Sequence, residues 1–228
     1  MRGTNRQKVE VLRWTVVAVA VFLLAGCVGS QVNVKYQLSD QSAAPGQTMR
    51  WSFDTDPVGG LPRGGTVFSG TWIVGPEGDA PSLPNVLCQT GTAEFPAQVL
   101  GDTVYTDVVL SAHFKPVSGR MDQAAGLIFR VQDKNNYYIL RANALEDNVN
   151  IYKYAGGQRS SLGEGSAKVA SGQWQELRAD VVGNRIRGFL NGQLVVEAAD
   201  DAYNAGKVGL WAKADSITCF DDVAASAQ

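Results

Sequence analysis

The stretch from Ala124 to Asn143, "AAGLIFRVQDKNNYYILRAN", decides the fold class of this chain. Side chains alternate with a period of two on either side of the polar tip "DKNN", whose Asp and Asn residues favour turns. Since successive side chains of a strand point to opposite faces, the stretch predicts a β-hairpin with one face in a core. The polar residues Arg130, Gln132 and Arg141 then lie on the other face, which is either solvated or a binding surface.

The same pattern continues to the C-terminus. Two pairs, Gly183-Asn184 and Asn191-Gly192, stand between apolar runs in the manner of two-residue hairpin turns. Further short strands are predicted at residues 106–114, 149–154, 158–162, 174–182, 185–190, 194–198, 208–212 and 217–223. Many short strands separated by turn residues predict an all-β protein with the architecture of an antiparallel β-sandwich.

The first 26 residues have the features of a secretory signal peptide. Four basic residues precede an apolar run from Trp14 to Ala25 that is interrupted only by Thr15, and this run is shorter than the ~20 residues of a membrane span. The run ends in "LLAGC", which resembles the bacterial lipobox. This resemblance implies cleavage before Cys27 and lipidation of its sulfur by palmitate-like chains, so that lipid alone attaches the protein to a membrane.

Three segments follow from this interpretation: a lipoprotein signal peptide at 1–26, a lipidated cysteine with a flexible tether at 27–48, and a β-sandwich domain at 49–228. Removing 26 of the 228 residues leaves 202, enough for one sizeable core. The leader holds four basic residues and one acidic residue, so the net charge changes from −2 to −5. That charge argues against nucleic acid as a partner. The expected location is the bacterial envelope, outside the cytoplasm, and on the outer membrane where there is one.

Two cysteines remain once Cys27 is assigned to lipid. Outside the cytoplasm Cys88 and Cys219 can oxidise to a disulfide, which would close a loop of more than a hundred residues and add ~4–5 kcal/mol in the chain-entropy treatment. The alternative is a pair of separate buried thiols, because free cysteine is common in protein cores. Both readings fit the sequence.

The run from about Trp72 to Val223 resembles the concanavalin A-like lectin/glucanase superfamily. The resemblance is carried by "SGQWQELRADVVGNRIRGFLNGQLVVEA", by "AGKVGLWAKADS" and by the last strand "CFDDVAA". Its order of motifs is that of laminin G-like jelly-roll modules, and within the superfamily it is similar to the bacterial 3-keto-disaccharide hydrolase domain. The resemblance implies two antiparallel sheets in a jelly roll, with sugar held on the concave sheet or its rim loops.

Catalytic residues are hard to nominate in this sequence. The Glu-x-Asp-x-x-Glu strand of the superfamily's glycanases is absent, since Glu77-Gly78-Asp79 lies in a loop and no glutamate follows three residues later. Glycosidases need two positioned carboxyl groups. His113 is the single histidine and is the candidate base for an enzyme acting on 3-keto-glycosides, which would remove a proton beside a ketone. Whether the protein is an enzyme stays open.

Carbohydrate recognition is the leading functional prediction. Arg130, Tyr137, Arg141 and Trp211 are the candidate binding residues, because aromatic rings can stack on sugars and arginine can donate to hydroxyl groups. Asp221 matches the position at which relatives hold calcium, so a structural Ca²⁺ is the one cofactor considered. The alternatives are a hydrolase or lyase of 3-keto-glycosides and a structural envelope lipoprotein that binds another protein.

Overall fold

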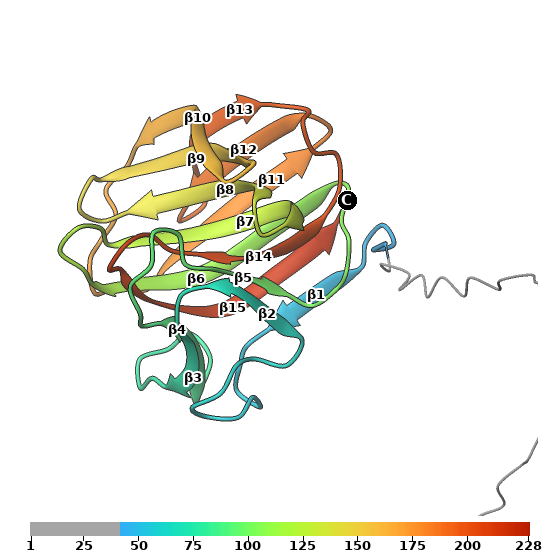
Figure 1. The fold of residues 1–228 in the computed structure, drawn as a ribbon. Coiled ribbons are helices and arrows are strands. Elements are labelled where there is room, and N and C mark those ends of the chain that lie inside the picture. The colour runs from blue at the N-terminus through green and yellow to red at the C-terminus, as the bar shows by residue number, and fades with distance from the viewer. Residues whose placement is uncertain (1–41) are drawn as a thin grey trace, which may run out of the picture. The chain divides into compact units, whose positions relative to one another are not determined.

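The computed structural model describes residues 42–228, which lie within the compact unit Ser39–Gln228. The segments predicted as signal peptide and lipidated cysteine lie outside the described residues. Fifteen strands and no helix form in residues 42–228, so no helix there could span a membrane. The strands form two antiparallel sheets, which confirms the predicted all-β sandwich (Figure 1).

The eight-stranded sheet has the order β13-β12-β11-β6-β15-β4-β3, with β1 also paired to β15. Its strands are β1 (Thr48–Trp51), β3 (Trp72–Pro76), β4 (Asn85–Gln89), β6 (Val108–Ser118), β11 (Gln175–Val182), β12 (Arg185–Leu190), β13 (Gln193–Ala199) and β15 (Ile217–Ala227).

The seven-stranded sheet has the order β10-β9-β8-β7-β14-β5-β2. Its strands are β2 (Gly65–Ser69), β5 (Ala97–Leu100), β7 (Ala124–Asp133), β8 (Asn136–Asn143), β9 (Asn148–Ala155), β10 (Gln158–Ser166) and β14 (Lys207–Trp211). Figure 1 shows this sheet stacked on the eight-stranded one, with β10 and β13 at the same side of the sandwich.

The main core lies between the two sheets and follows the alternation of the sequence. On β6 Leu110, Ala112 and Phe114 are buried in it, and on β7 Leu127 and Phe129 face them from the other sheet. Each fully buried leucine or phenylalanine side chain contributes about 1.5–3 kcal/mol relative to an exposed one. The hairpin turns form as predicted, with Asn191 and Gly192 both at positive φ between β12 and β13.

A disulfide joins β4 to β15. Cys88 and Cys219 are directly opposite each other in the antiparallel pairing of the two strands, and the structure bonds their sulfurs. The two residues are 131 positions apart in the chain. Of the two readings that the sequence left open, the structure therefore has the disulfide.

Candidate functional site

The seven-stranded sheet carries a second hydrophobic cluster on the side turned away from the main core. We call this side the aromatic face; its buried members include Tyr137, Tyr152 and Trp211. Trp211 lies across Gly126 of the neighbouring strand β7, where an added Cβ would come within 3.0 Å of Trp211 Cε3. The missing side chain at Gly126 therefore makes room for the indole on the sheet.

Two side chains cover the indole of Trp211. Phe95, from the loop between β4 and β5, stacks on it with 5.7 Å between ring centroids and 22° between planes. The guanidinium of Arg159 on β10 lies 4.4 Å from the centre of the Tyr152 ring and 5.9 Å from that of Trp211. This geometry is a cation–π arrangement over a wall of aromatic rings.

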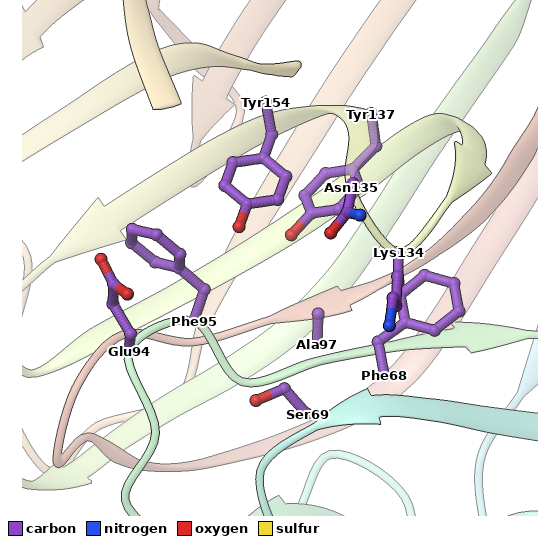
Figure 2. A pocket seen from close by; sticks show the side chains of 9 residues that line it. All are labelled: Phe68, Ser69, Glu94, Phe95, Ala97, Lys134, Asn135, Tyr137 and Tyr154. Atoms are coloured by element: carbon purple, nitrogen blue, oxygen red, sulfur yellow. The ribbon is translucent and has the colours of Figure 1, made fainter. Parts of the chain in front are cut away.

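A pocket of about 250 Å³ opens beside this aromatic wall. Figure 2 shows the hydroxyl groups of Tyr137 and Tyr154 pointing into it, with Phe95 on one side and Lys134 with Phe68 on the other. The remaining residues that line it are Ser69, Glu94, Ala97 and Asn135. The pocket thus combines apolar ring faces with hydroxyl, carboxylate, ammonium and amide groups. We call it the aromatic pocket.

The two tyrosines of the aromatic pocket keep their protons at neutral pH. Burial, and to a smaller extent the neighbouring Tyr154, raises the pKa of Tyr137. Burial and the charge of Glu94 raise the pKa of Tyr154. Because a neutral phenol both donates and accepts a hydrogen bond, each hydroxyl can bind a ligand hydroxyl in either sense.

A second, polar pocket of about 180 Å³ opens on the same face and is lined by Glu146, Asn148, Asn150, Glu164, Gly165 and Ser166. Arg141 Nη2 bonds Glu146 Oε2 at 2.5 Å and Asn148 Oδ1 at 2.7 Å beneath it. Burial raises the pKa of Glu146, but the hydrogen bond from Asn148 and the charge of Arg141 bring it below its usual value. Glu146 is therefore ionised at neutral pH. We call this site the polar pocket.

Three of the four predicted binding residues lie on the aromatic face. Tyr137 and Trp211 belong to its hydrophobic cluster, and the Arg141 guanidinium lies 5.4 Å from the Tyr152 ring. All three are buried, with at most 2% of their surface exposed. Trp211 has no exposed surface, because Phe95 and Arg159 cover it. These residues form the floor of the face rather than its accessible surface.

Arg130 does not lie with the other three. It sits at a β-bulge in β7, with φ of +48°, so Val131 takes the place on the aromatic face that strict alternation gives to Arg130. Its guanidinium donates to the backbone oxygens of Thr106 (2.9 Å), Gly183 (2.7 Å) and Tyr203 (3.1 Å). This side chain is 1% exposed and holds three loops together through these hydrogen bonds.

His113 lies on the other sheet. It points outward from β6, as its alternation with Ala112 and Phe114 predicts, and its Nδ1 is 3.9 Å from Asp222 Oδ2. The eight-stranded sheet therefore separates His113 from the aromatic face. The structure does not bring the candidate base and the candidate sugar-binding residues together.

Asp221 is fully buried on β15. Its carboxylate accepts hydrogen bonds from the amides of Ser82 (2.8 Å) and Asp222 (2.7 Å), and Ser82 Oγ lies 3.0 Å from Oδ1. Calcium needs six to eight oxygen ligands, whereas N–H and O–H donors face this carboxylate. Residues 42–228 hold no group of three or more His, Cys, Asp or Glu side chains that could bind a metal ion. The surroundings of Asp221 do not fit the predicted calcium site.

The accessible part of the aromatic face was not found from the sequence. Asn148, Asn150, Tyr152 and Tyr154 alternate along "NVNIYKY", so this stretch did contain a period-two signal for one polar and aromatic face. Phe95 gave no such signal, because it belongs to an irregular loop. Its place over Trp211 depends on how that loop packs in three dimensions.

Comparison with known proteins supports both the fold and the family. A levanase of Bacillus subtilis (strain 168) is 26% identical over 175 residues, which are 74% of this chain but 24% of the levanase. The chain thus spans about a quarter of the length of that relative. The solved structure of the carbohydrate-binding module CBM66 from Bacillus subtilis aligns with a TM-score of 0.61 and 21% identity, covering 72% of this chain and 96% of the module.

A transglycosylase, Crh5, aligns with a TM-score of 0.54 and 10% identity over 82% of this chain and 89% of its own. At such identities these two structures establish a shared jelly-roll fold. The family model of the 3-keto-alpha-glucoside-1,2-lyase-like domain matches residues 70–224, about two thirds of the chain. The chain therefore belongs to the family of 3-keto-alpha-glucoside-1,2-lyase-like domains.

Proposed function

We propose that this protein is a carbohydrate-binding module that holds its ligand on the aromatic face. The observation that carries the proposal is the aromatic pocket, in which two phenol hydroxyls and two phenyl rings converge. A sugar has an apolar face made of C–H groups and a rim of hydroxyl groups. Pockets that combine aromatic surface with a few placed polar groups recognise such ligands.

Fructans are the first ligand class to examine. The levanase similarity supports this choice, because it covers 74% of the chain and therefore includes most of the domain. The name of that enzyme refers to the whole protein, of which the chain matches a quarter. Neutral glucans belong in the same panel, because the fold alone does not distinguish between neutral polysaccharides.

The experiment is isothermal titration calorimetry with levan, cellulose-derived and starch-derived oligosaccharides. The protein is the chain without residues 1–26 and with Cys27→Ser, which keeps it in solution. We expect one of these carbohydrates to bind and Phe95→Ala to weaken the binding at least tenfold, about 1.4 kcal/mol or more. Phe95 is partly exposed at the pocket wall, so its loss removes the stacking surface directly.

The matched control is Trp174→Ala. Trp174 is a partly buried aromatic residue whose indole donates to Asp79 and packs beside Lys115 on the other sheet. Its replacement should leave the affinity unchanged. Equal losses in both variants, or no binding of any saccharide, would contradict the proposal, and the search would then move to a protein partner in the envelope.

Family membership supports a second candidate, an enzyme that cleaves 3-keto-glycosides. In such a cleavage a base removes the proton from the carbon between the ketone and the anomeric carbon, and a double bond forms between these two carbons as the anomeric C–O bond breaks. The departing oxygen then takes up a proton. Glu94 is the carboxylate of the aromatic pocket and would be the base. Release of nitrophenol from p-nitrophenyl 3-keto-α-glucoside, lost in Glu94→Gln while binding persists, would support the enzyme over the simple binder.

We further propose that the mature protein is a lipid-anchored lipoprotein of the bacterial envelope. The supporting observation is the sequence "LLAGC" after a short apolar run, which predicts lipid on Cys27. Labelling of cells with an alkyne-tagged palmitate should mark the wild-type protein and leave Cys27→Ser unmarked. Equal labelling of both forms would exclude this cysteine as the anchor.

A further inference from the structure

The aromatic face has a second pocket that a single sugar in the aromatic pocket would not fill. On this basis we infer that the protein binds a neutral oligosaccharide that spans both pockets. One end of the oligosaccharide lies in the aromatic pocket, and hydroxyl groups of the other end bind in the polar pocket. This inference rests on the proposed carbohydrate-binding function and extends it. It assigns a role to Glu164, which the sequence did not single out.

The two pockets lie at different points along the same strand. Tyr154 lines the aromatic pocket and Asn150 lines the polar pocket, and both point to the aromatic face of β9. Four residues of strand place them about 13 Å apart, at about 3.3 Å per residue. That distance exceeds one sugar ring, so a ligand that reaches both pockets contains at least two or three residues.

The surface between the pockets is suited to a continuous chain. Tyr152 lies between Asn150 and Tyr154 on the same face, and its hydroxyl accepts a hydrogen bond from Asn150 Nδ2 at 3.0 Å. Arg159 lies over the Tyr152 ring, and its Nη1 is buried without a hydrogen-bond partner among residues 42–228. The faces of the Phe95, Tyr152 and Trp211 rings surround this guanidinium and hold it in place between the two pockets.

The polar pocket offers hydrogen-bond acceptors held in fixed positions. Asn150 Oδ1 accepts from the amide of Gly165 (3.2 Å) across the β9–β10 pair, and Glu164 accepts from Ser161 Oγ (3.1 Å). Arg141 is 2% exposed, and its Nε has no hydrogen-bond partner among the described residues. This buried cation fixes Glu146 and Asn148 from below, so the pocket is preformed before a ligand arrives.

The charge of the polar pocket sets its specificity. Glu146 and Glu164 place two carboxylates around one small cavity, and the pKa of Glu146 lies below its usual value. Carboxylates accept hydrogen bonds from neutral sugar hydroxyls but repel the carboxylate of a uronic acid. The polar pocket should therefore favour neutral oligosaccharides over acidic ones of the same length.

The first test is the dependence of affinity on chain length. Calorimetry with fructose, levan-derived di- and trisaccharide, glucose, cellotriose, maltotriose and trigalacturonic acid would use the chain without residues 1–26 and with Cys27→Ser. We expect a neutral trisaccharide to bind at least tenfold more tightly than its monosaccharide. Trigalacturonic acid should bind at least tenfold more weakly than that trisaccharide.

The second test separates the two pockets by mutation. Glu164 is exposed on β10, so Glu164→Gln removes a charge without disturbing the core. This change should weaken trisaccharide binding about tenfold and leave monosaccharide binding unaltered, whereas Phe95→Ala weakens both. Glu176→Gln is the matched control, because Glu176 lies in the eight-stranded sheet, opposite His113 in the pairing of β11 with β6.

The outcomes distinguish this inference from the proposed function. A monosaccharide that binds as tightly as the trisaccharide, with Glu164→Gln without effect on either, would overturn the two-pocket inference and leave the carbohydrate-binding function standing. Absence of binding to all seven saccharides would overturn both. A preference for trigalacturonic acid would also overturn the inference, since it would contradict the acidic character of the polar pocket.

Discussion

Arg130 shows how one residue can look like a ligand-binding group in the sequence and yet hold the fold together. Its guanidinium donates to three backbone oxygens, those of Thr106, Gly183 and Tyr203, and is 3.4 Å from Asp107. Gly183 belongs to the turn between β11 and β12 of the eight-stranded sheet, whereas Arg130 is in the seven-stranded sheet. The side chain therefore links the two sheets at one end of the sandwich.

We predict that Arg130→Ala lowers the free energy of unfolding by about 3 kcal/mol or more, because three carbonyl groups lose a charged donor that is buried with them. Chemical denaturation followed by fluorescence would measure this loss. Folded Arg130→Ala protein should bind saccharides as the wild type does. A large loss of saccharide affinity at unchanged stability would show that Arg130 contacts the ligand after all.

At the scale of single elements, the pairing of β4 with β15 depends on a covalent link as well as on hydrogen bonds. β4 is a short strand near one edge of its sheet, and only three residue pairs join it to β15. The disulfide between Cys88 and Cys219 is one of these pairs. It restricts the unfolded chain by closing a loop across most of the domain.

We predict that the double variant Cys88→Ser/Cys219→Ser is less stable by about 3–5 kcal/mol than the oxidised wild type. The closed loop is long, with the two cysteines 131 positions apart, and long loops lose the most entropy in the unfolded state when they are closed. Denaturation of the wild type with and without reductant provides the control. If reduction changes the stability of the wild type by less than 1 kcal/mol, the link contributes little.

The strand β9 contributes Tyr154 to the aromatic pocket, and Asn148 and Asn150 to the polar pocket. Asn148, Asn150, Tyr152 and Tyr154 follow one another at every second position, as the alternation of a strand requires. The strand β7 is the opposite case, because its bulge at Arg130 breaks the alternation and reverses the assignment of faces. A bulge adds one residue without a strong sequence signal, so the period-two assignment of side chains to the two faces of β7 was wrong beyond this point.

At the scale of the whole molecule, Asp200 connects the two sheets. It follows β13 of the eight-stranded sheet, and its carboxylate binds Tyr138 Oη (2.5 Å) and Lys153 Nζ (2.6 Å) of the seven-stranded sheet. Burial raises the pKa of Asp200, but the hydrogen bonds from Lys153 and Tyr138 outweigh burial and leave it below its usual value of 3.8. The ionised form is therefore the one that stabilises the fold.

This shift predicts a pH dependence of stability. A carboxyl group whose folded pKa is lowered contributes stability above its unfolded pKa, and that contribution disappears as the pH falls through the folded pKa. Asp200→Asn should therefore lower the free energy of unfolding by about 2 kcal/mol at pH 7 and by much less near pH 2. Denaturant unfolding at both pH values measures the two differences. Equal losses at both would show that packing, not charge, explains the effect.

The sequence by itself determined the fold class, the hairpin turns and the outward direction of His113. These features depend on local geometry, because the two-residue period of a strand and the positive φ of turn residues are properties of neighbouring residues. Only the tertiary structure decided that Phe95 covers Trp211, that Arg130 leaves the aromatic face and that His113 lies on the other sheet. Those outcomes depend on which distant strands and loops pack together, and local alternation carries no information about such contacts.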